Sequence, residues 1–167
     1  MSMFGLRQVG INDPRGKDKK KLIVYVEIDR CATDAIQSVT GCSAGKRTMK
    51  LVDYGKMAAT FVNLSTGEAV RILAKEESKS LAKNYFPEIE DKYQAQTSAY
   101  KVMPDEELFS WEKVSVEIPR EDMPGRPLKR VICEKCGESV QDNREIILDG
   151  KTLCKACTGS GYYRKLK

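Results

Sequence analysis

The six cysteines are the residues of this 167-residue chain best suited to bind a metal or to react, and four of them form a repeated pattern. Two residues separate Cys133 from Cys136, and Cys154 and Cys157 repeat that spacing after seventeen intervening residues. Two residues between cysteines let one tight turn direct both sulfurs toward a single ion at about 2.3 Å. The distance between the pairs is also typical of four-cysteine zinc sites. The sequence therefore predicts one zinc ion per chain, bound by these four residues.

The alternatives to zinc are two disulfides, redox-active Cys-x-x-Cys pairs, and an iron or iron–sulfur centre. Disulfides are typical of secreted proteins, and residues 1–8 lack the apolar stretch of a signal peptide. A redox pair normally follows a strand in a larger βαβ unit, which the short C-terminal segment does not supply. Iron stays open, because it also binds thiolates. Since four thiolates leave no position for water, we expect the zinc to be structural.

Two further thiols, Cys31 and Cys42, lie upstream among glycines and charged residues. The run Gly41–Thr48 (GCSAGKRT) is not a phosphate-binding loop. The first glycine of that motif would fall on Thr40, and the residue after Lys46 is an arginine instead of a hydroxyl residue. A thiol near a cation is favoured as the thiolate, which suits metal binding or redox work. The alternative is that both cysteines are small buried hydrophobic residues.

Composition and charge limit the function classes. The chain has no histidine, which excludes a Ser-His-Asp triad, a histidine-activated cysteine and a histidine metal ligand within it. Residues 1–125 carry 19 Lys/Arg and 19 Asp/Glu, whereas residues 126–167 carry 10 and 5. The excess positive charge of the C-terminal segment can attract an acidic protein or a nucleic acid. No apolar run approaches the ~20 residues of a membrane helix, so we expect a cytoplasmic location and no membrane partner.

Apolar periodicity and turn residues predict the elements that position these side chains. Residues 1–10 have the pattern of the end of a helix, and Ser-Thr-Gly at 65–67 predicts a hairpin. The predicted strands are Lys21–Ile28, Thr48–Val52, Met57–Leu64, Glu68–Ala74 and Trp111–Ile118, and the predicted helices are Ala32–Val39, Glu76–Tyr85 and Glu88–Tyr100. This mixture favours an α+β core with a mixed or antiparallel sheet.

Three prolines, a glycine and six charged residues mark residues 119–130 as a linker. It would separate a core domain, residues 1–118, from a zinc-finger domain, residues 131–167. Within the finger, Asp149-Gly150 predicts a type I′ turn between two short strands. This order of elements predicts a treble-clef or zinc-ribbon finger: a turn, a hairpin, and a second cysteine pair that opens a short helical turn.

Three segments resemble the FmdE-like family of formylmethanofuran dehydrogenase proteins, and they occur in the family's order: Asp29–Gln37, Gly41–Thr48 and Asp53–Phe61. Residues 130–163 resemble the treble-clef finger that some members carry after the core. The resemblance implies an α+β core, a closely intertwined homodimer, and a role in one-carbon metabolism of the methanogenesis type. The family typically opens with a His-x-His-x-Cys-Pro-Gly-like motif, which residues 1–10 would follow and which this sequence does not contain.

The resemblance also implies candidate catalytic residues, at the positions that match the family's other polar motifs. They are Cys42, Lys46, Asp53, Tyr54 and Lys56.

Three functions are compatible with these observations. The first, which we favour, is an accessory or subunit-like protein of a molybdenum- or tungsten-dependent formylmethanofuran dehydrogenase, whose cofactor other subunits hold. The second is a dimeric regulatory zinc-finger module that binds nucleic acid or protein through its basic C-terminal segment. The third is a free-standing enzyme, for which no base is identified. The basic and aromatic residues of that segment are Lys129, Arg130, Lys151, Lys155, Tyr162, Tyr163, Arg164, Lys165 and Lys167.

Overall fold

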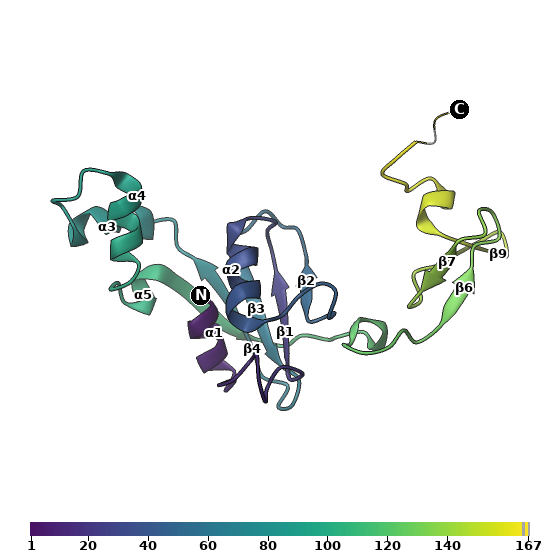
Figure 1. Cartoon of the computed structure of the whole chain (residues 1–167), viewed down its shortest axis with the longest axis horizontal. Coiled ribbons are helices and arrows are strands. Elements are labelled where there is room, and N and C mark those ends of the chain that lie inside the picture. Colours follow the sequence, from purple (N-terminus) through teal and green to yellow (C-terminus); the bar gives the residue numbers. More distant parts are fainter. Residues whose placement is uncertain (165, 167) are drawn as a thin grey trace. The chain divides into compact units, whose positions relative to one another are not determined.

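A five-stranded sheet organises residues 1–117, the first of two units into which the chain divides (Figure 1). In this computed structural model, which describes residues 1–164 and 166, the strand order is β2-β1-β3-β4-β5. Strand β1 is parallel to β2, and the other neighbours are antiparallel. The strands are β1 Leu22–Val26, β2 Met49–Leu51, β3 Ala58–Asn63, β4 Ala69–Ala74 and β5 Phe109–Val114. The mixed sheet and its helices confirm the predicted α+β fold.

One face of the sheet packs against two helices, α1 (Ser2–Gln8) and α2 (Cys31–Thr40). Alternate residues of the strands point toward these helices and form the main hydrophobic core, in which Phe61 is fully buried. A Cβ atom on Gly5 would lie 2.5 Å from the Phe61 ring. Glycine at this position therefore lets α1 lie directly on the sheet.

A helical arm joins β4 to β5 and consists of α3 (Ser78–Tyr85), α4 (Lys92–Ala99) and α5 (Asp105–Leu108). Its buried residues Ala82, Ala99 and Met103 form a small cluster separate from the main core. The predicted helix Glu88–Tyr100 begins later, at Lys92, because the Asp91 side chain accepts a hydrogen bond from the Gln94 amide at 2.8 Å and caps the helix there.

The last strand of the sheet also differs from the predicted range Trp111–Ile118. Strand β5 begins at Phe109 and ends at Val114, where its register with Ala69 of β4 ends. Residues 115–118 keep the alternating pattern but have no strand opposite them, because β4 begins at Ala69. Alternation alone does not reveal where the neighbouring strand stops.

The second unit, Ile118–Lys167, contains two short antiparallel hairpins and little hydrophobic core. Its elements are η1 Arg120–Asp122, β6 Arg130–Ile132, β7 Ser139–Gln141, β8 Ile146–Leu148, β9 Lys151–Leu153 and η2 Lys155–Thr158. Asp149 and Gly150 have φ values of 49° and 74°, as the predicted type I′ turn requires. Among the residues described in this unit, the buried hydrophobic ones are Cys133 and Leu153.

Residues 119–130, which the sequence predicts to be a linker, make specific contacts with the rest of this second unit. The Asp142 carboxylate accepts a hydrogen bond from the Leu128 amide at 2.9 Å. Lys129 pairs with Glu145 at 2.6 Å, and Asp122 accepts a hydrogen bond from Arg144 at 2.9 Å. Two charged residues of the predicted linker, Asp122 and Lys129, therefore have partners on the finger.

None of the helices in the described ranges, residues 1–164 and 166, combines the length and the apolar character that a membrane span requires.

Candidate metal centre

The four predicted zinc ligands converge in the second unit. The Sγ atoms of Cys133, Cys136, Cys154 and Cys157 all lie within 4.8 Å of one another, and those of Cys136 and Cys154 are 3.9 Å apart. A tetrahedral zinc ion with Zn–S bonds of about 2.3 Å places its sulfurs about 3.8 Å apart. The cluster therefore has the dimensions and the donor atoms that zinc requires. In the part of the chain that the structure describes, no other group of three or more His, Cys, Asp or Glu side chains is placed to hold a metal.

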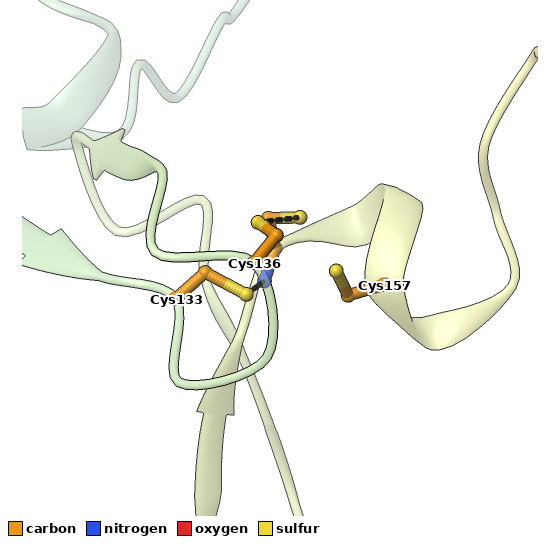
Figure 2. Close-up of side chains that lie close together, drawn as sticks. Cys133, Cys136 and Cys157 are labelled. Carbon is orange, nitrogen blue, oxygen red and sulfur yellow. Dashed lines mark hydrogen bonds between the residues drawn. The ribbon is translucent and has the colours of Figure 1, made fainter. Parts of the chain in front are cut away.

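Two local turns direct the sulfurs toward this point (Figure 2). The first pair follows β6, and the Gly137 amide donates a hydrogen bond to the Cys133 carbonyl at 2.8 Å to close the turn. Gly137 has a φ of 76°, which glycine adopts without strain. The second pair spans the start of η2, where the Cys157 amide donates to the Cys154 carbonyl at 3.0 Å. Each pair thus presents both sulfurs from a single turn.

The two pairs are also bonded to each other. The Cys154 amide donates a hydrogen bond to the Cys133 sulfur at 3.3 Å. This bond is the largest cause of a lowered pKa of Cys133, about 6, because the amide favours the thiolate, and the Cys136 and Lys135 amides add to it. The Glu134 amide donates to the Thr152 carbonyl at 2.9 Å, which joins the first turn to β9. Since zinc binds the thiolate, these contacts orient the ligands and favour the metal-binding form of Cys133.

The core thiols do not form a comparable centre. Cys42 is buried, donates its S–H to the Leu22 carbonyl at 3.8 Å, and has a pKa raised by burial. Cys31 is exposed and is the first residue of α2, whereas Cys42 follows the end of that helix. A helix of ten residues is about 15 Å long, so the two sulfurs are too far apart to share an ion. The sequence left two interpretations of Cys42 open, a thiolate for metal binding or redox work and a small buried hydrophobic residue. Its burial favours the second.

The five candidate catalytic residues fall into two groups. Lys46 donates to the Gly41 carbonyl at 3.0 Å and lies near Cys42, whose sulfur contacts the first residue of β1. The loop that contains Asp53, Tyr54 and Lys56 lies at the other end of β1, where the Tyr54 and Lys56 amides both donate to the Glu27 carbonyl at 3.1 Å. Residues 22 and 27 of an extended strand are about 16 Å apart. The structure therefore does not bring all five residues into one site.

Lys56 lines an open groove of about 740 Å³ in the first unit. Its apolar wall includes Met57, Leu73 and Leu81, and Glu106 of α5 also lines it. This groove was not predicted from the sequence, because its walls come from β4, α3 and α5, which are distant from the Lys56 loop in the chain.

An ion pair between Glu27 and Arg71 was likewise not predicted. The guanidinium donates two hydrogen bonds to the carboxylate, at 2.7 and 2.8 Å. The pair spans β3, since Glu27 follows β1 and Arg71 lies in β4, and the side chain of Glu27 is only 7% exposed. No sequence signal connects two charges on separate strands.

Comparisons with known proteins match both units. The FmdE family model, described by its link to a molybdenum formylmethanofuran dehydrogenase operon, matches residues 1–110. A model of the prokaryotic dksA/traR C4-type zinc finger matches residues 126–160, which include all four cysteines of the candidate metal centre.

Two individual proteins are similar over nearly the whole chain. A probable S-adenosyl-L-methionine-binding protein of Archaeoglobus fulgidus is 28% identical over 180 residues. The alignment covers 97% of this chain and 48% of that protein, so the chain spans about half the length of this relative. The crystal structure of a tungsten formylmethanofuran dehydrogenase FmdE-like protein from Syntrophus aciditrophicus matches with a TM-score of 0.61 and 20% identity, over 96% of this chain and 80% of that one. At this identity the match indicates a common fold.

Proposed function

Since the chain belongs to the FmdE family, we propose that it is a zinc-binding accessory or subunit-like protein of a molybdenum- or tungsten-dependent formylmethanofuran dehydrogenase, and so acts in one-carbon metabolism. The observation that supports an accessory role best is that the family's polar motifs and the metal centre belong to different units of the chain. The four thiolates saturate a zinc ion in the finger, whereas the motif residues of the core lie at opposite ends of β1. The redox cofactor would then belong to other subunits.

Zinc in this proposal is structural. It would cross-link the turn after β6 to the turn at η2 and replace the hydrophobic core that this unit lacks. The S-adenosyl-L-methionine of the Archaeoglobus relative is not part of the proposal, because the chain matches only 48% of that protein.

The proposal includes a homodimer, and the helical arm supports it. The arm has only three buried residues in its cluster, yet Tyr93 and Val102 on it are 77% and 58% exposed. Two eight-residue helices are marginal in water without tertiary packing. A second copy that packs against the arm would supply that packing. We expect sedimentation at micromolar concentration to give about twice 18.8 kDa, with Val102→Lys shifted toward the monomer and Lys113→Ala as the control. A wild-type monomer at that concentration would contradict the dimer.

Purification from cells that express the dehydrogenase tests the accessory role. Affinity-tagged protein should retain the dehydrogenase subunits through high-salt washing, and the complex should contain molybdenum or tungsten together with zinc. Deletion of the gene should lower formylmethanofuran oxidation in extracts, and purified protein should restore it. Recovery of the protein without these subunits, and unchanged oxidation in the deletion strain, would refute the role.

A further inference from the structure

A hollow of about 550 Å³ opens beside the candidate zinc centre. The three partly exposed cysteines line it, together with Lys135, Glu138 and Tyr163. The three cysteines are Cys136, Cys154 and Cys157. The fourth ligand, Cys133, is buried away from solvent. A single zinc ion would occupy only a small part of this volume, so the hollow is large enough for a further group that lies against the metal centre.

The polar groups of the hollow suit a ligand that carries both donors and acceptors on a flat ring. Lys135 donates a hydrogen bond to the Cys157 carbonyl at 3.2 Å and has further N–H groups to donate. The Glu138 carboxylate and the thiolate sulfurs are acceptors. Tyr163 is 46% exposed and provides an aromatic ring. Nucleobases combine amino donors, ring-nitrogen or carbonyl acceptors and a stacking face, so they fit these groups.

A second aromatic ring lies beside the first. Tyr162 is 98% exposed, and its ring centroid is 5.2 Å from that of Tyr163 at an interplanar angle of 73°. The two rings thus present faces in different directions, and each is accessible to an unstacked base. Fully exposed aromatic side chains next to a cationic surface are typical of proteins that bind single strands by stacking.

The positively charged side chains of this unit are suited to contact the phosphate groups of a nucleic acid. Ion pairs in the second unit engage Lys129 with Glu145 and Arg144 with Asp122. In residues 118–164, which the structure describes, the cations that form no ion pair with a carboxylate are Arg120, Arg126, Arg130, Lys135, Lys151, Lys155 and Arg164. Lys155 directly follows a zinc ligand, and Arg164 directly follows Tyr163. Lys165 and Lys167 of the predicted basic segment lie outside the described residues.

The secondary structure of this unit favours a single strand over a duplex. Reading the major groove of DNA takes an α-helix or a two-stranded ribbon. Here the described helical elements are single turns, η1 and η2, and every strand has three residues. Stacking on a tyrosine also requires an unpaired base.

We infer that the hollow beside the zinc centre binds one base of a single-stranded nucleic acid, with Tyr163 and Tyr162 as stacking groups and Lys155 and Arg164 as phosphate contacts. The inference rests on the zinc centre of the proposed function but not on the dehydrogenase. Duplex nucleic acid and an acidic protein surface are outcomes that the test distinguishes from it.

Fluorescence anisotropy with the zinc-loaded full-length protein tests this inference. The probes are labelled 12-nucleotide single strands of RNA and DNA, the matching duplexes, and a polyglutamate peptide of equal charge. We expect micromolar binding of at least one single strand at about 50 mM salt, and binding at least tenfold weaker to its duplex and to the peptide. Equal or tighter binding of the duplex or of the peptide overturns the inference, as does the absence of single-strand binding.

Paired variants locate the site. Tyr163→Ala should weaken single-strand binding about tenfold or more, and Tyr163→Phe should bind like the wild type, because stacking needs the ring and not the hydroxyl. Lys155→Ala should lower the slope of log K against log salt by about 0.7. Lys113→Ala in the first unit is the matched control.

Zinc content and circular dichroism verify that each variant keeps its fold, and Tyr162→Ala provides a second stacking variant at a fully exposed position. Wild-type affinity in both alanine variants of the tyrosines overturns the inference. If binding fails while the protein still purifies with the dehydrogenase subunits, only this inference falls and the proposed function stands.

Discussion

The folded structures of the two units are stabilised by different interactions. In Met1–Glu117, a sheet face and two helices bury a continuous set of apolar side chains, among them Phe61 and Ile72 at full burial. In the described part of Ile118–Lys167, the buried hydrophobic residues are one leucine and one zinc ligand. The hydrophobic effect can stabilise the first unit without a metal, whereas the second depends on four sulfurs that meet at one point.

Two buried cysteines, one in each unit, show the same contrast between apolar burial and metal binding. Cys42 behaves as an apolar side chain in the first unit, since it is buried and its pKa is raised by burial. Cys133 is buried as well, but backbone amides, the Cys154 amide foremost, donate to its sulfur and lower its pKa to about 6. Burial alone therefore does not determine the role of a cysteine. Hydrogen-bond donors and further sulfurs around it decide whether the thiol or the thiolate is favoured.

Removal of zinc is the change with the largest expected effect, and it should affect one unit only. Zinc binding to finger peptides corresponds to about 10–16 kcal/mol of apparent free energy near neutral pH. Chelation, or Cys136→Ser, should release the metal and expose residues 131–164 to proteases, while residues 1–117 remain resistant. Elemental analysis, expected to give one zinc per folded chain, and limited proteolysis with mass spectrometry measure both effects. Cys31→Ser is the matched control, because Cys31 is exposed and belongs to the first unit. A metal-free finger that stays resistant would contradict the comparison.

Phe61→Ala is the reciprocal change in the first unit. Truncation of a fully buried phenylalanine typically lowers the free energy of unfolding by about 3–5 kcal/mol, through lost burial and the cavity that remains. Chemical denaturation followed by tryptophan fluorescence measures the effect, since Trp111 lies in β5 of the same sheet. The exposed Tyr54→Ala should change this free energy by no more than about 0.5 kcal/mol. Zinc content should be unchanged in both variants, and loss of zinc from Phe61→Ala would show that the units are not independent.

The smallest expected effect concerns the reactivity of the two core thiols. In the zinc-loaded protein at pH 8, iodoacetamide should modify Cys31 rapidly and Cys42 only after unfolding, because Cys42 is buried with a raised pKa. Peptide mass spectrometry after timed quenching gives both rates, and Cys31→Ser removes the fast one. Equal rates at the two positions in the folded protein would mean that the site of Cys42 opens readily to solvent.

The sequence by itself determined the features that depend on a few neighbouring residues. The zinc ligands follow from two Cys-x-x-Cys turns, the hairpin turn from Asp149-Gly150, and the α+β class from the alternation of hydrophobic periods. Each of these depends on backbone geometry within a short window, where residue type fixes the accessible conformations. The family assignment rests on short segments of the same kind, and the family model confirms it.

Only the tertiary structure decided which distant residues meet. Cys42 and Lys56 belong to neighbouring sequence motifs, but they contact opposite ends of β1, because a strand carries its two ends about 16 Å apart. The Leu128 amide of the predicted linker donates to Asp142, and the hollow beside the metal centre forms because the chain after η2 places Tyr163 next to the cysteines. Such contacts arise from how elements pack. Their free energies depend on partners that lie far away in the chain, so no local pattern of residues encodes them.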